Sequence, residues 1–138
     1  MSSMPTTLEP LYVADTMALI WWLTKDRKLG TQAARVFHAA EQIETSVLVS
    51  AVAIAELYYA DKKFQLFDDF AAVFHDLRTS LYIQFIAFEA AHVLDFDIDV
   101  DVPEMHDRII TGLARRFGAP LLTSDPKIAA SKVVKTIW

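Results

Sequence analysis

Residues 106–125 combine a helix, a stop signal and a short buried strand. Apolar residues recur at helical spacing through the first half and form one face of an amphipathic helix. This helix opens at Asp101 or at the Pro103-Glu104 pair, because proline suits a first helical turn and an acid suits its positive end. Gly118, with a proline two positions later, ends it. Residues 120–123 are too short for a helix and too apolar for an exposed loop, so they predict a buried strand.

The same alternation of strand and helix runs along the rest of the chain. It predicts an α/β fold, a three-layer α/β/α sandwich with a mainly parallel central sheet. The length of 138 residues fits one domain, so we expect a flexible lead-in at 1–10 and a single domain at 11–138. The expected strands are 11–14, 45–49, 81–87, 120–123 and 133–138. The other expected helices are 17–23, 32–43, 51–60, 64–78 and 88–94, and residues 127–130 form a turn or short helix.

Composition excludes several classes of protein. The net charge of −5 argues against a generally basic nucleic-acid binder, but residues 108–138 hold six Lys or Arg against one acid. This asymmetry hints at an anionic ligand on the C-terminal side, although a solvated basic face explains it nearly as well. The absence of cysteine excludes disulfides and thiolate metal sites and fits the cytoplasm. We expect no membrane segment and no secretory signal.

Acidic residues stand at the junctions between strands and helices. Asp15 and Asp125 each follow a predicted strand, and Asp107 lies in the first turn of the 106–117 helix. Considered singly, each of these acids has a common structural explanation: a helix cap, a turn aspartate or an acid that interacts with the helix dipole. Because parallel strands place their carboxyl ends along one edge, we expect these acids to lie near one another.

Glu56 is unusual among these acids. It is the only charged residue between Glu44 and Asp61, and its neighbours in the predicted helix are side chains expected to be buried. Such a carboxylate either pairs with an arginine, such as Arg108 or Arg115, or binds a cation. Several carboxylates in one cleft need a cation to offset their repulsion. Oxygen ligands without His or Cys favour Mg²⁺ or Mn²⁺ over zinc, and such ions typically act on phosphate esters.

Residues 95–102 alternate acid and apolar side chains strictly. They lack the glycine and the terminal glutamate of an EF-hand calcium loop. We therefore expect an exposed connector that its apolar side chains pin to the domain.

Four motifs together resemble the PIN-domain ribonucleases, and most closely the VapC-type toxins of toxin–antitoxin pairs: residues 11–16, 50–57, 103–110 and 118–125. The resemblance covers residues 11–138. It implies Mg²⁺-dependent endoribonuclease activity, with Mn²⁺ able to substitute. It places Asp15, Asp107 and Asp125 on the metal, while Glu56 holds a water of the metal or helps to activate the attacking water. The cut would leave a 5′-phosphate and a 3′-hydroxyl.

The resemblance also implies supporting residues and partners. Hydroxyl groups at Thr16, Thr123 and Ser124 would lie beside the acids. The partners would be an RNA substrate, a cognate antitoxin and a second copy of the chain in a homodimer. The sequence departs from the family in the bulky, charged helix end at 115–117. Candidates for RNA phosphate contacts are Arg108, Arg115, Arg116 and Lys127.

Three other interpretations of the sequence are considered. A phosphatase with an aspartyl nucleophile at Asp15 is disfavoured, because no second acid stands two residues later. A PIN nuclease of RNA processing that is not a toxin fits the same acids. A non-catalytic module that binds RNA or protein would not need all four of them.

Overall fold

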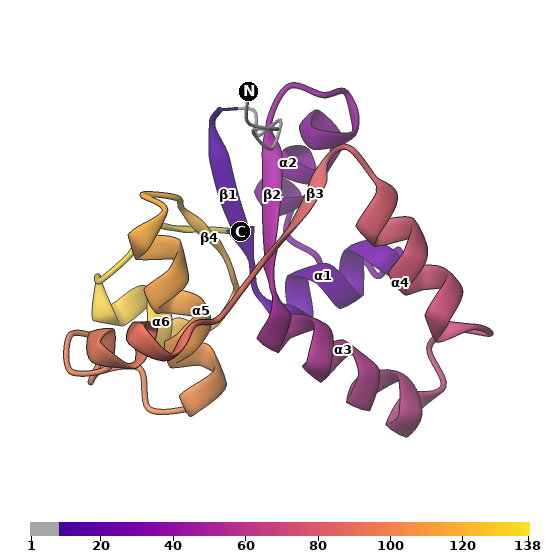
Figure 1. Cartoon of the computed structure of the whole chain (residues 1–138). Coiled ribbons are helices and arrows are strands. Elements are labelled where there is room, and N and C mark those ends of the chain that lie inside the picture. Colours follow the sequence, from indigo (N-terminus) through magenta and orange to yellow (C-terminus); the bar gives the residue numbers. More distant parts are fainter. Residues whose placement is uncertain (1–8) are drawn as a thin grey trace, which may run out of the picture.

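The computed structural model describes residues 9–138, so most of the expected lead-in at 1–10 lies outside the described part. Helices cover the central sheet, with α3 and α4 on one side and α5 and α6 on the other (Figure 1). None of the helices within the described residues is long and apolar enough to cross a membrane. The elements are β1 (Leu11–Ala14), α1 (Thr16–Leu23), α2 (Thr31–Glu41), β2 (Ser46–Ser50), α3 (Ala51–Phe64), α4 (Phe70–Thr79), β3 (Ile83–Ile86), the 3₁₀ helix η1 (Ala90–Asp95), α5 (Met105–Arg116), β4 (Leu121–Leu122), α6 (Pro126–Ser131) and β5 (Thr136–Ile137).

All five strands are parallel, in the order β3-β2-β1-β4-β5. The predicted α/β sandwich with a parallel sheet is thereby confirmed. The strand order reverses at β1, because β2 and β3 extend the sheet to one side and β4 and β5 to the other. Parallel α/β sheets bind ligands at such a switch point, outside the carboxyl ends of the strands. The residues that follow β1 and β4 are therefore the first place to look for a site.

The core forms where helices cover both faces of the central strands. Every residue of β2 is buried, and so is the second half of β1. Strands buried on both faces carry near-continuous apolar runs, which is why these segments do not alternate. The largest fully buried side chains outside the sheet include Phe37, Leu19 and Leu57, contributed by α2, α1 and α3.

Helix α5 has the predicted form. It begins after Glu104, whose side chain accepts a hydrogen bond from the backbone N–H of Asp107 at 2.9 Å. Of the two predicted openings the structure thus uses Pro103-Glu104. Residues 109–114 are all buried against the sheet and η1. The helix ends at Gly118, whose φ of +62° lies in the left-handed region that glycine adopts without strain.

The predicted helix over 64–78 is wrong at its start. Helix α3 continues to Phe64 and ends where Gln65 takes a left-handed conformation. The side chain of Asp61, which is buried, accepts a hydrogen bond from the N–H of Phe67 at 2.9 Å and fixes the turn. Helix α4 then starts afresh at its N-cap, Asp69.

The prediction that 95–102 is an exposed connector is wrong at Asp99. Its carboxylate is fully buried and forms a two-point ion pair with the guanidinium of Arg115 on α5. The apolar neighbours Ile98 and Val100 are exposed instead, and Val102 is the only apolar residue of 95–102 that is buried. An ion pair to an acid therefore holds this segment, with Val102 as its apolar anchor.

Candidate active site

Asp15 lies where β1 gives way to α1. Its backbone N–H donates to the carbonyl of Leu122 at 3.1 Å, which joins the ends of β1 and β4. Its side chain caps α1 by accepting the N–H of Ala18 at 2.8 Å, and Thr123 hydrogen-bonds to the same carboxylate. The strand-end aspartate is thus held by the helix that it caps and by the end of the neighbouring strand β4.

Asp125 occupies the matching position after β4. Its N–H donates to the hydroxyl of Thr123 at 3.1 Å, and its carboxylate caps α6 through the N–H of Lys127 at 2.8 Å. Thr123 is buried and contacts both aspartates, while Ser124 is exposed. The hydroxyl of Thr123 therefore organises the two strand ends.

Glu56 reaches this region from α3. One carboxylate oxygen, Oε1, accepts a hydrogen bond from the hydroxyl of Thr16, the first residue of α1. The other, Oε2, lies 3.4 Å from Nδ1 of His106. Neither arginine considered for Glu56 pairs with it, because Arg108 donates to the carbonyl of Val102 and Arg115 to Asp99. Glu56 is not neutralised by a buried arginine.

The electrostatics link these carboxylates into one cluster. Burial raises the pKa of Asp15 to about 6, although the hydrogen bonds from Thr123 and Ala18 act to lower it, and the charges of Asp125 and Glu56 add to the rise. The pKa of Asp107 is also raised to about 6, chiefly by burial and in addition by the charges of Glu104, Asp125, Glu56 and Asp15. The four predicted acids therefore act on one another through space. We call Asp15, Glu56, Asp107 and Asp125 the acidic cluster.

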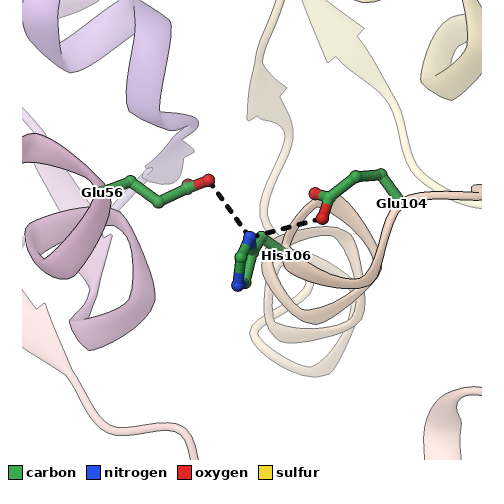
Figure 2. A group of neighbouring side chains, drawn as sticks. All are labelled: Glu56, Glu104 and His106. Atoms are coloured by element: carbon green, nitrogen blue, oxygen red, sulfur yellow. Dashed lines mark ion pairs between the residues drawn. The ribbon is translucent and has the colours of Figure 1, made fainter. Parts of the chain in front are cut away.

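Glu104 and His106 are the residues that sequence reasoning missed. Figure 2 shows the imidazole of His106 between the carboxylates of Glu56 and Glu104, which come from α3 and from the start of α5. The distances from Nδ1 are 3.4 Å to Glu56 and 3.3 Å to Glu104. Burial acts to raise the pKa of Glu104, but backbone N–H groups and the nearby His106 hold it below its ordinary value. The sequence predicts Glu104 only as an opening of the helix, and no local signal marks His106 as a ligand.

Three of the four basic residues expected at phosphates already contact protein oxygens. Arg108 donates to the carbonyls of Val102 and Val100, Arg115 to Asp99, and Arg116 to Asp95. Lys127 differs, since its side chain is exposed on α6 next to Asp125 and forms no ion pair within residues 9–138. Among the four candidates, it is therefore the one whose charged group makes no hydrogen bond or ion pair within the described residues.

The comparisons with known proteins agree with this geometry. The family model of the PIN domain matches residues 12–133. The chain belongs to the PIN domain family. The predicted family resemblance is thereby confirmed, and VapC structures are among those that share this PIN domain's fold. Among curated proteins, the sequence comparison finds no match.

Solved structures share the fold of this PIN domain at low sequence identity. VapBC2 from Rickettsia felis, in a crystal structure with a DNA fragment from its promoter, aligns with a TM-score of 0.69 and 14% identity over 92% of this chain and 97% of the other. VapC20 from Mycobacterium tuberculosis, a Sarcin-Ricin loop cleaving toxin, aligns at 0.68 and 14% identity over 91% and 97%. A toxin–antitoxin complex from Klebsiella pneumoniae aligns at 0.67 and 18% identity over 92% and 96%.

The acidic cluster of this PIN domain has the chemistry of a divalent-cation site. All its members are carboxylates, and the fold leaves them without a Lys or Arg partner among residues 9–138. Burial raises the pKa values of Asp15 and Asp107, and the charges of the neighbouring acids add to both rises. Carboxylate oxygens are ligands for hard divalent cations, whose charge would offset this repulsion.

Proposed function

We propose that this PIN domain is a Mg²⁺-dependent endoribonuclease that acts in the cytoplasm as the toxin of a type II toxin–antitoxin pair. The observation that carries the proposal is the acidic cluster at the switch point of the sheet, with the pKa values of Asp15 and Asp107 both raised to about 6. Membership of the PIN domain family supports a nuclease. The likeness to toxin structures supports the biological role.

In the proposed site, Asp15, Asp107 and Asp125 hold the cation, and Mn²⁺ is expected to substitute for Mg²⁺. A bound cation polarises the phosphoryl oxygen and stabilises the leaving oxygen. Glu56 accepts a proton from the attacking water, and Thr16 fixes its orientation through the hydrogen bond to Oε1. In-line attack on the phosphodiester leaves a 5′-phosphate and a 3′-hydroxyl.

We further propose Lys127 as the first of the basic candidates to contact an RNA phosphate. Its exposed side chain stands on the helix that Asp125 caps, and contact with the backbone needs no base recognition. The three arginine candidates are less available for RNA, because each already donates to protein oxygens: Arg108, Arg115 and Arg116. Lys127→Ala should weaken RNA binding and reduce its salt dependence, measured by titration of a labelled RNA at several salt concentrations.

The proposed partners are a cognate antitoxin and a second copy of the chain. Three of the similar structures are VapBC2, a toxin–antitoxin complex and FitAB bound to DNA, which supports an antitoxin for this chain as well. Exposed aromatic and aliphatic side chains offer apolar contact area for such partners, among them Tyr59, Phe64 and Leu81.

The decisive experiment is cleavage of a structured RNA by the purified full chain. We expect cleavage with Mg²⁺ or Mn²⁺, none in EDTA, and 5′-phosphate ends on the products. Asp15→Asn and Asp107→Asn should reduce cleavage to the level seen in EDTA, and Glu56→Gln should slow it about 100-fold or more. Asp69→Asn is the matched control, because Asp69 also caps a helix but lies at the start of α4, outside the cluster.

Two results would overturn the metal-dependent mechanism: cleavage that persists in EDTA, or cleavage unaffected by both aspartate substitutions. The toxin role has its own test. Expression of the wild-type chain should arrest growth and Asp15→Asn should not. A nuclease that is active in vitro but harmless on expression would instead indicate a role in RNA processing.

A further inference from the structure

Glu56, Glu104 and His106 form a compact group of metal-ligating side chains beside the acidic cluster. Their ligand atoms all lie within 4.8 Å of one another, and no other three His, Cys, Asp or Glu side chains within residues 9–138 come this close (Figure 2). We call these residues the histidine trio. Only Glu56 belongs to both groups.

Two of the three separations in the trio match those between ligands of a shared cation, and the oxygens of Glu56 and Glu104 lie within 4.8 Å of each other. Nδ1 of His106 lies 3.3 Å and 3.4 Å from its two carboxylate oxygens. Both separations exceed the usual N–H···O range of about 2.7–3.2 Å, and Nδ1 carries at most one hydrogen for two acceptors. Two ligands on a tetrahedral ion with bonds of about 2.0–2.1 Å are separated by about 3.3–3.4 Å. Adjacent ligands on an octahedral Mg²⁺ are closer, at about 3.0 Å.

The donor set points to the same class of ion. Zn²⁺ binds both imidazole nitrogen and carboxylate oxygen, whereas Mg²⁺ prefers oxygen ligands, so the imidazole of His106 favours a transition metal. All three side chains are partly exposed, so a water molecule can complete four-coordination. Oε2 of Glu56 faces His106, while its Oε1 stays hydrogen-bonded to Thr16. The trio can therefore bind an ion without withdrawing Glu56 from the acidic cluster.

We propose that the histidine trio is a second metal site, which takes a tetrahedral transition-metal cation of the Zn²⁺ type. The site extends the proposed nuclease function through the shared Glu56, but its existence is tested by metal binding alone, without RNA. If the protein proves not to be a nuclease, the metal-binding measurement still decides whether this second site exists.

The test is calorimetric titration of Zn²⁺ into the full chain at neutral pH, with excess Mg²⁺ present to fill the acidic cluster. We expect one site in the wild type, with an affinity reduced about tenfold or more in His106→Gln and in Glu104→Gln. Asp15→Asn should bind Zn²⁺ as the wild type does, because Asp15 belongs to the acidic cluster only. His38→Gln is the matched control, since Nδ1 of His38 also lies near a glutamate, at 3.5 Å from Glu41, but with no third ligand.

A spectroscopic measurement keeps the proposal testable if a variant fails to fold. Wild-type protein loaded with Co²⁺ should give the intense visible absorption of a four-coordinate site. A weak six-coordinate spectrum would overturn the proposal. So would Zn²⁺ binding that survives His106→Gln, or that Asp15→Asn abolishes as fully as His106→Gln does. In those cases His106 forms ion pairs only, or the ion belongs to the acidic cluster.

Discussion

The ion pair between Asp99 and Arg115 should be the largest single polar contribution to stability in the η1–α5 region. Asp99 is 0% exposed, and Arg115 Nη2 donates to its Oδ2 at 2.9 Å with a second contact from Nη1. Arg115→Met leaves the aspartate buried without a counter-charge. Removing one partner of a buried pair costs about 3–5 kcal/mol, a large share of the about 5–15 kcal/mol that stabilises a typical domain.

The assay is urea unfolding of the metal-free protein, followed by circular dichroism and tryptophan fluorescence. The double variant Asp99→Asn/Arg115→Met should be more stable than Arg115→Met alone, because the buried charge is gone. The matched control is Arg116→Met. Its partner Asp95 keeps some access to water and Arg116 is 42% exposed, so its loss should be clearly smaller. A cost below about 1 kcal/mol for Arg115→Met, or strictly additive effects in the double variant, would refute the reasoning.

Further predictions concern two glycines and the pH dependence of stability. Gly30→Ala should lower the free energy of unfolding by about 1–3 kcal/mol in urea titrations, since a Cβ there would lie 2.5 Å from the carbonyl carbon of Trp138. Gly118→Ala should cost about 1–2 kcal/mol for a different reason, because its φ is +62° but the space around it is open. Asp15 and Asp107 have native pKa values near 6, above the 3.8 of an ordinary aspartate, so the native state binds more protons between these values. The stability that they contribute to the metal-free protein should therefore fall as pH rises from about 4 to about 6, and the rise in Tm on adding Mg²⁺ should be larger at about pH 7.5 than at about pH 5. An increase in Tm with Mg²⁺ that is equal at both pH values would contradict this.

The strand ends could be predicted from the sequence because the signals there are local. Residues 11–14 form β1 with the predicted bounds, and Asp15 follows at once as the cap of α1. The parallel sheet then brings Asp15 and Asp125 to the same edge without any further information. The existence of a cluster is a property of topology, and topology follows from the alternation of elements.

The features that the sequence did not predict have a common cause. Each depends on a contact with a residue that is distant in the sequence or lies outside the local pattern. The alternation in 95–102 indicates which residues share a face, but not which face is inside. That choice depends on Arg115, sixteen residues after Asp99. His106 became a candidate ligand only when α3 brought Glu56 to it. Likewise, the end of α3 depends on Asp61 and its bond to the N–H of Phe67.

The fold holds several acids together without arginines because it uses helix starts as partial counter-charges. Asp15 caps α1, Asp125 caps α6 and Glu104 caps α5, each by accepting backbone N–H groups. A helix N-terminus carries roughly half a positive charge, which reduces repulsion but does not cancel a full negative one. Asparagine caps a helix about as well as aspartate does. Asp15→Asn should therefore preserve α1 while removing one charge, so a loss of cleavage in this variant reports on the cation and not on the fold.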